Sequence, residues 1–292
     1  MKQGFFQSAH PFSRLILVAF LMTTCYLITL GLSILVAYTA YDTDWETILK
    51  LLEGRNYGEH IALLKFLQMC YSTGLFLIPS LLGAYLIMGS AGRYLYINRL
   101  PSLYIMMIVI LIMIAVIPVI NFLAEINYTI PFPEKLSALE EHVKASDEKS
   151  REMMDSFLNT GSTAGLLTNL LMIAIIPALG EEFLFRGVVQ RIFSEWTRSS
   201  HAGVWIAAIL FSLMHFQYFG FLQRILLGAS FGYMLVWTGN MWLPVLAHLV
   251  NNGIGVIYFY LFFNGRIQND LEKVGTGADE SLYVIISLLL TA

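Results

Sequence analysis

Seven separate stretches of the chain, each about 20 residues long, are almost entirely apolar. A helix needs roughly 20 consecutive apolar residues to cross the hydrocarbon core of a bilayer, which is about 30 Å thick. The composition agrees, because 57% of the 292 residues are hydrophobic and 13% are charged, whereas soluble domains carry about 25% charged residues. The sequence therefore predicts an all-α fold, a polytopic transmembrane helical bundle with seven to eight spans. The predicted spans are residues 15–38, 61–88, 101–124, 165–187, 203–219, 220–238 and 241–263, and a shorter apolar run, 281–292, follows them.

Positive charge is concentrated in three short connections, residues 1–14, 89–100 and 188–202. They contain Lys2, Arg14, Arg93, Arg99, Arg191 and Arg198, with Glu195 as the opposing acidic residue. The connections 39–60, 125–162 and 264–280 are longer and rich in acidic residues. Orientation follows Lys and Arg in short loops, so we expect the amino terminus to be cytoplasmic. The first apolar run is longer than that of a signal peptide, which favours a retained anchor in a bacterial inner membrane.

A polar connection at residues 126–162 divides the chain. Within it, Leu136, Leu139 and Val143 recur at the spacing of an amphipathic helix, which we expect to lie outside the cytoplasm. The predicted organisation is then three leading transmembrane helices in residues 1–125, the polar connection in 126–162, a helical core with the chemically interesting residues in 163–263, and a polar loop with a terminal apolar segment in 264–292.

Three other features predict local structure in the spans. Gly228 and Gly232 form a GxxxG step, which permits close approach of a neighbouring helix. Pro177 should bend its helix and free a backbone carbonyl. Lys65 and Arg224 lie near the ends of their spans, so we expect both side chains to extend to the membrane interface. For Arg224 the alternative is contact with a substrate carboxylate.

Charged side chains occur inside the fourth apolar stretch. Such groups are costly in hydrocarbon and usually mark function. Glu182 and Arg186 are four residues apart, so they share a helix face and can form an ion pair. Glu181 lies about 100° further around the helix, which leaves its carboxylate free to accept a proton. The alternative interpretation is a charge cluster at a helix end, where charge is tolerated.

Later helices add His215, His248 and Asn252. A lone histidine in an apolar run, such as His215, is often a hydrogen-bonded core residue. His248 and Asn252, however, are spaced i and i+4 and share one helix face. Measured from the predicted cytoplasmic helix ends at about 1.5 Å per residue, Glu181 lies about 22 Å deep, His215 about 18 Å, His248 about 10 Å and Asn252 about 16 Å. We therefore expect these residues to meet in one site inside the membrane.

The order and spacing of these residues resemble the type II CAAX prenyl endopeptidases and their bacterial relatives, the CPBP (CAAX protease and bacteriocin-processing) or abortive-infection intramembrane proteases. The family pattern is Glu-Glu-x-x-x-Arg, then Phe-x-x-x-His, then His-x-x-x-Asn or Asp. The chain has Glu181, Glu182 and Arg186, then Phe211 and His215, then His248 and Asn252. The resemblance covers roughly residues 160–263.

This resemblance implies peptide-bond hydrolysis by an intramembrane endopeptidase. Glu181 with His215 would activate a water molecule as general base. His248 and Asn252 would stabilise the oxyanion that develops on the scissile carbonyl. Glu182 and Arg186 would hold the helix and the first carboxylate in place, and Phe211 is a supporting residue of the same pattern.

A catalytic metal is an alternative for the same residues. Glu181, His215 and His248 could provide three ligands and leave a fourth position for water, as in catalytic zinc sites. The sequence lacks the HExxH motif of zinc proteases, and asparagine is a poor zinc ligand. We favour a mechanism without a metal and keep zinc as the possible cofactor.

The expected partners are a membrane protein or peptide substrate and the lipid bilayer, with no nucleic acid. The sequence fixes neither prenylation of the substrate nor an oligomeric state. Two other functions could use a buried polar cluster. A proton-coupled carrier should show inverted repeats, which the sequence lacks. A non-catalytic peptide-binding immunity protein would not need the complete polar set, so the endopeptidase is the favoured interpretation.

Overall fold

The computed structural model describes residues 4–41, 43–52, 58–130, 135, 137–268, 270–277 and 280–291. These residues form helices and connections without a β-strand, which confirms the predicted all-α bundle. Lys2, Leu136, the side chain of Leu139 and Ala292, all used in the predictions, lie outside this description. The helices are α1 (Pro11–Ala40), α2 (Trp45–Leu52), α3 (Ile61–Ser72), η1 (Thr73–Leu77), α4 (Ile78–Met88), α5 (Ala91–Tyr94), α6 (Leu103–Ala115), α7 (Ile117–Thr129), α8 (Ser137–Leu158), α9 (Thr163–Asn169), η3 (Leu170–Ile175), α10 (Ile176–Glu182), η4 (Phe183–Val189), α11 (Gln190–Thr197), α12 (Ser200–Leu213), α13 (Phe221–Thr238), α14 (Trp242–Phe263), η5 (Leu271–Lys273) and α15 (Ser281–Thr291).

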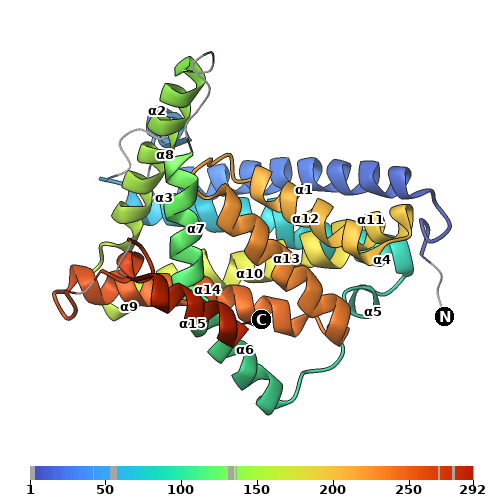
Figure 1. Ribbon diagram of the computed structural model, residues 1–292. Helices are drawn as coiled ribbons and strands as arrows, with labels where there is room; N and C mark the ends of the chain where they lie inside the picture. The colour runs from blue at the N-terminus through green and yellow to red at the C-terminus, as the bar shows by residue number, and fades with distance from the viewer. Residues whose placement is uncertain are drawn as a thin grey trace.

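Within the described residues, five continuous helical segments are long and apolar enough to cross a membrane, so the protein is an integral membrane protein. They are Pro11–Ala40, Ile61–Met88, Leu103–Thr129, Thr163–Thr197 and Trp242–Phe263. The predicted spans 203–219 and 220–238 correspond to α12 and α13, which are not among these five. The 14 residues of α12 extend only about 21 Å, because the chain leaves the helix after Leu213. Figure 1 shows α1, α4 and α10 to α14 packed together, with α8 projecting from the bundle.

Two of the membrane-crossing helices contain a π-helical turn that ends two residues before a proline. The turn η1 precedes Pro79, and η3 precedes Pro177. Proline has no N–H to donate to the carbonyl four residues earlier, and wider π turns occur where this ladder is interrupted. The two altered helices approach closely at Gly180, where an added Cβ would lie 3.0 Å from Cβ of Phe76. The close contact at Gly180 therefore brings α10, and with it Glu181, against η1.

The predicted close packing at Gly228 and Gly232 is confirmed. A Cβ on Gly228 would lie 3.2 Å from Cβ of Ala208, and one on Gly232 would lie 3.0 Å from a methyl of Val204. Both neighbours are on α12. The α13 backbone therefore rests directly on α12, as the GxxxG step requires.

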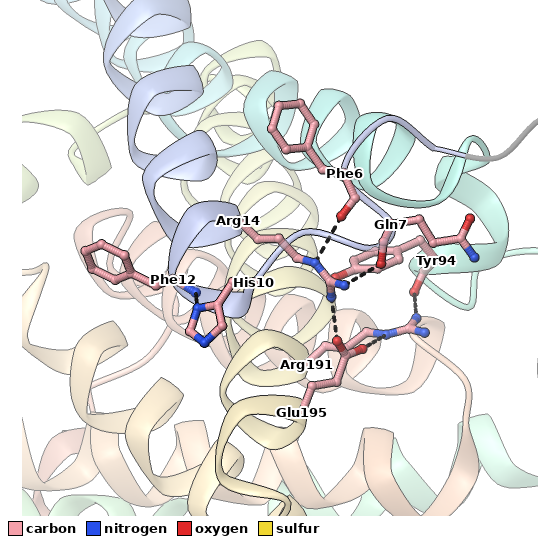
Figure 2. A network of polar contacts seen from close by, with 8 residues as sticks. All are labelled: Phe6, Gln7, His10, Phe12, Arg14, Tyr94, Arg191 and Glu195. Carbon is pink, nitrogen blue, oxygen red and sulfur yellow. Dashed lines mark hydrogen bonds and ion pairs between the residues drawn. The ribbon is translucent and has the colours of Figure 1, made fainter.

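The connections predicted to be cytoplasmic lie together at one end of the bundle. Figure 2 shows Arg14 paired with Glu195, which also contacts Arg191, while Arg191 donates to the carbonyl oxygen of Tyr94 (2.9 Å). The Arg191 guanidinium stacks over the Tyr94 ring at 4.2 Å. Burial raises the pKa of Tyr94 to about 12, so this ring stays uncharged. The network ties the amino-terminal segment and α5 to α11.

At the opposite end, Lys65 does not reach the interface as predicted. Its side chain is buried, and Nζ donates to the carbonyl oxygen of Phe157 (2.8 Å). The Asn169 side chain donates to the same oxygen (2.7 Å). The last carbonyls of a helix have no partner in the helix and attract cations. The need of the Phe157 carbonyl at the end of α8 for a donor explains why Lys65 turns inward. The two hydrogen bonds to this carbonyl hold α8 against α3 and α9.

Candidate active site

A cavity of about 490 Å³ lies among α10, α13, α14 and the turn after α12. Glu181, His215, His248 and Asn252 all line it, so the four residues predicted to form one site share one cavity. Glu182 and Arg186 are not among the lining residues. The wall also contains Arg224 and four polar residues that the sequence patterns did not single out: Gln68, Gln217, Gln223 and Asn251. Met154 and Phe157 show that α8 contributes to the wall as well.

Glu182 joins two helices behind the cavity. Its Oε1 accepts from Nη1 of Arg186 (2.9 Å) and from Nδ1 of His248 (2.7 Å). The Glu182 and Arg186 side chains are 0% and 1% exposed. The ion pair predicted from the i, i+4 spacing is therefore present. The bond to His248 was not predicted, because no local pattern relates residues on separate helices.

His248 stands between the two glutamates. Its Nδ1 is bound to Glu182, and its Nε2 lies 3.9 Å from Oε2 of Glu181. That separation is too long for a direct hydrogen bond, but a water molecule could contact both atoms at ordinary hydrogen-bond distances of about 2.8 Å. The two carboxylates thus have different environments, since Glu182 is paired with arginine and Glu181 faces the cavity.

Aromatic rings separate the buried arginine from the cavity. Phe211 lies under the Arg186 guanidinium at 4.5 Å, and its ring meets His215 edge to face at 4.9 Å. Phe231 stacks on His248 at 5.8 Å and is 5.6 Å from the same guanidinium. Cation–π contacts of this kind stabilise a desolvated guanidinium. Phe211 was predicted as a supporting residue, whereas Phe231 carries no motif that would identify it.

His215 follows the end of α12 instead of lying within a long span. Its Nδ1 is 2.9 Å from the carbonyl oxygen of Phe211. A carbonyl oxygen only accepts hydrogen bonds, so Nδ1 carries the proton and the neutral ring keeps a lone pair on Nε2. In this arrangement His215 can accept a proton or a hydrogen bond through Nε2.

Asn252 is bound to the carbonyl that Pro177 frees. Its Nδ2 donates to the carbonyl oxygen of Ile173 (2.9 Å), four residues before the proline. Its Oδ1 accepts from Nδ2 of Asn251 (3.1 Å). One N–H of Asn252 remains after these contacts. The freed carbonyl was predicted near the site, and its partner was not.

Arg224 was predicted to extend to the interface but instead lines the cavity. It donates to the carbonyl oxygen of Gln217 (3.2 Å) and contacts the Gln217 side chain. For the metal alternative, the described residues contain no group of three His, Cys, Asp or Glu side chains placed to hold an ion. Nδ1 of His248 is already bound to Glu182.

Comparison with known proteins agrees with the motifs. Residues 163–254 match the Rce1-like family model. The full description of that family is "Type II CAAX prenyl endopeptidase Rce1-like". The resemblance inferred from the sequence is confirmed over this range, which contains every motif residue from Glu181 to Asn252. The Rce1-like match does not include the first 162 residues, although Gln68, Met154 and Phe157 complete the cavity wall.

Three bacterial relatives share part of the chain. "Uncharacterized protein YpbD" of Bacillus subtilis (strain 168) is 29% identical over 92 residues, covering 30% of this chain and 44% of the relative. The "Uncharacterized 24.3 kDa protein" of Escherichia coli is 28% identical over 188 residues, covering 60% and 85%. "Putative membrane peptidase YdiL" of B. subtilis is 29% identical over 84 residues, covering 29% and 34%. The chain thus spans less than half of YpbD and YdiL. No solved structure matches it. The Rce1-like match and YdiL support a membrane peptidase of the CAAX-protease-like kind.

Proposed function

We propose that the protein is an intramembrane endopeptidase that hydrolyses a peptide bond in a membrane-associated protein or peptide. The observation that carries this proposal is the cavity on which Glu181 from α10, His215 from the turn after α12, and His248 and Asn252 from α14 converge. The Rce1-like match over residues 163–254 supports the same reaction class. The location that we propose is a bacterial inner membrane, and the relatives described above come from bacteria.

In the proposed reaction, Glu181 is the general base for an attacking water. The water lies between Oε2 of Glu181 and Nε2 of His248, which are 3.9 Å apart, and the Nε2 lone pair of His215 assists its deprotonation. The water oxygen attacks the scissile carbonyl carbon while its proton passes to Glu181. When the C–N bond breaks, Glu181 returns that proton to the leaving amine. A carboxylate acting in this way contributes about 10²- to 10⁴-fold to the rate.

The carbonyl oxygen becomes negatively charged in the tetrahedral intermediate. We assign its stabilisation to the remaining N–H of Asn252 and to the Nε2–H of His248 in its doubly protonated form, in which both ring nitrogens donate and Glu182 balances the charge. The His248 ring holds this proton before and after the reaction. Both side chains are fixed before substrate arrives, His248 by Glu182 and Asn252 by the Ile173 carbonyl. Donors that are oriented in advance contribute most to oxyanion stabilisation. Glu182 and Arg186 act by holding His248.

The test is cleavage of a fluorogenic membrane-peptide library by protein purified in detergent. We expect wild type to cleave, and Glu181→Gln, His215→Ala and His248→Ala to lose at least about 100-fold in turnover while remaining folded. Met154→Ala is the matched control, because Met154 lies on the cavity wall and carries no polar group. Variants that cleave as well as wild type would show that this site is not catalytic.

Each protein is also assayed with a chelator. We expect the wild-type rate to be unchanged. A loss of activity that zinc restores would instead assign a metal to these side chains. If wild type cleaves no member of the library, proton-coupled flux in proteoliposomes separates the carrier from a peptide-binding protein, which would bind library peptides without cutting them.

A further inference from the structure

The residue proposed to assist the base, His215, lies on a turn between α12 and α13 and not on a helix. The turn comprises residues 214–220. Phe216, next to His215, has φ of 51°, in the left-handed region that residues with a side chain rarely adopt. Its side chain is 86% exposed, so it has little packing of its own to compensate the strain. A strained turn of this kind persists only when surrounding contacts fix it.

Contacts from residues near the turn account for part of this restraint. The Ser212 hydroxyl donates to the carbonyl oxygen of Phe221 (2.9 Å). Arg224 donates to the carbonyl oxygen of Gln217. Both residues belong to the segment that matches the family model.

The other restraint comes from α7, which lies outside that segment. Asn127 is 2% exposed. Its Nδ2 donates to the carbonyl oxygen of Tyr218 (2.9 Å), and its Oδ1 accepts from the backbone N–H of Leu222 (3.0 Å). The neighbouring Tyr128 ring packs on Phe219 with a centroid distance of 4.4 Å. One buried amide thus joins the turn to the first residues of α13.

We propose that Asn127 is a positioning residue for His215, so that a helix outside the family-matched segment sets the geometry of the catalytic site. The inference rests on the proposed function and deepens it. The side chain must donate at one end and accept at the other, which asparagine does and neither leucine nor ionised aspartate can. Displacement of a reacting group by about 1 Å can cost about 100-fold in rate.

The first test compares two asparagines of α7. Asn127→Leu has a similar volume and loses both bonds to the turn. Asn121→Leu is the matched control, because Asn121 donates to the carbonyl oxygens of Leu271 and Val274 in the carboxyl-terminal connection. We expect Asn127→Leu to lower kcat by about 10- to 100-fold with KM within about twofold, and Asn121→Leu to change kcat by less than about twofold. Equal losses in the two variants would overturn the assignment.

A double-mutant cycle shows whether Asn127 acts through His215. In the His215→Ala background, we expect Asn127→Leu to cause no further loss of residual turnover, since the group it positions is gone. An equal additional loss in that background would indicate a general effect on folding and overturn the proposal. Asn127→Asp keeps the acceptor for the Leu222 N–H, so we expect its kcat to lie between those of wild type and Asn127→Leu.

Hydrogen exchange tests the contact without using activity. We expect peptides covering residues 214–222 to exchange faster in Asn127→Leu and Asn127→Asp than in wild type, with no change there in Asn121→Leu. Unchanged exchange in this turn would overturn the proposal whatever the kinetics show. If wild type does not cleave but the turn exchanges faster, the proposed function fails while the role of Asn127 in fixing the turn stands.

Discussion

At the scale of single residues, Glu182 is a fully buried carboxylate that binds two partners on different helices. One oxygen accepts from both Arg186 and His248, and neither member of the ion pair is more than 1% exposed. Removing one partner of a buried pair leaves an uncompensated charge, which costs about 3–5 kcal/mol. This cost exceeds what the intact pair contributes, because most of it is the burial of the remaining guanidinium.

We therefore expect Glu182→Gln to lower the free energy of unfolding by about 3–5 kcal/mol, and to abolish cleavage because His248 loses its anionic acceptor. Thermal unfolding in detergent measures the first effect. The control is Glu46→Gln, which breaks the exposed i, i+4 pair with Lys50 and should hardly change the midpoint. If Glu182→Gln and Glu46→Gln unfold at the same temperature, breaking the buried ion pair does not carry the expected cost in stability.

Residue patterns predicted individual contacts only where both partners lie on one helix. The Glu182–Arg186 pair follows from i, i+4 spacing. The bonds from His248 to Glu182 and from Asn127 to Tyr218 join residues far apart in sequence, and they depend on how the helices rotate and cross. Lys65 and Arg224 were predicted wrongly for the same reason, since hydropathy gives a position along a helix but not the neighbour that the side chain meets.

At the scale of helices, the close packing of α13 depends on glycine at positions 228 and 232. A Cβ on Gly232 would lie 2.7 Å from Oε1 of Gln190 and 3.0 Å from Val204. Gln190 cannot simply turn away, because its Nε2 donates to the carbonyl oxygen of Gly232 (3.1 Å). A larger residue at position 232 must therefore displace α13 from both α12 and α11.

Gly232→Val should therefore destabilise the protein by about 1–3 kcal/mol, the usual cost of overpacking. Gly31→Ala on α1 is the matched control, because an added Cβ there meets nothing within 4 Å and alanine favours a helix by about 1 kcal/mol. The apparent unfolding midpoint should fall in the first variant and stay or rise in the second. A stable Gly232→Val would contradict the close contact.

Long apolar runs in the sequence correctly predicted long helices, as in α1 and α14. It did not predict the π turns η1, η3 and η4, whose bounds depend on hydrogen-bond register. It also extended the fifth span to residue 219, because Phe216, Tyr218 and Phe219 are apolar or aromatic, whereas the helix ends at Leu213. In this turn Phe219 packs on Tyr128 of α7, and the polar residues His215 and Gln217 line the cavity.

At the scale of the whole molecule, the connections form two groups at opposite ends. At one end, Phe6 N donates to the carbonyl oxygen of Leu86, and the indole of Trp242 donates to the carbonyl oxygen of Ile97 (3.0 Å). At the other, Asn264 donates to the carbonyl oxygen of Thr160 (3.0 Å). Figure 1 shows the amino-terminal end beside α5 and α11, away from α2 and α9. The connections rich in Lys and Arg and the acidic connections, which the sequence distinguishes by charge, therefore lie at opposite ends of the bundle.

The distribution of arginine and lysine predicts which end faces the cytoplasm, and a labelling experiment tests this prediction. Single cysteines are placed at Phe5 and Ser146, which lie in exposed segments belonging to the two groups, in a parent in which Cys25 and Cys70 are alanine. We expect a membrane-impermeant maleimide to label Ser146→Cys in intact cells and Phe5→Cys only after the membrane is opened, because loops rich in Lys and Arg stay in the cytoplasm. The reverse pattern would invert the orientation and move α8, with its part of the cavity wall, to the cytoplasmic side. Labelling of both positions from the same side would contradict the separation of the two groups of connections.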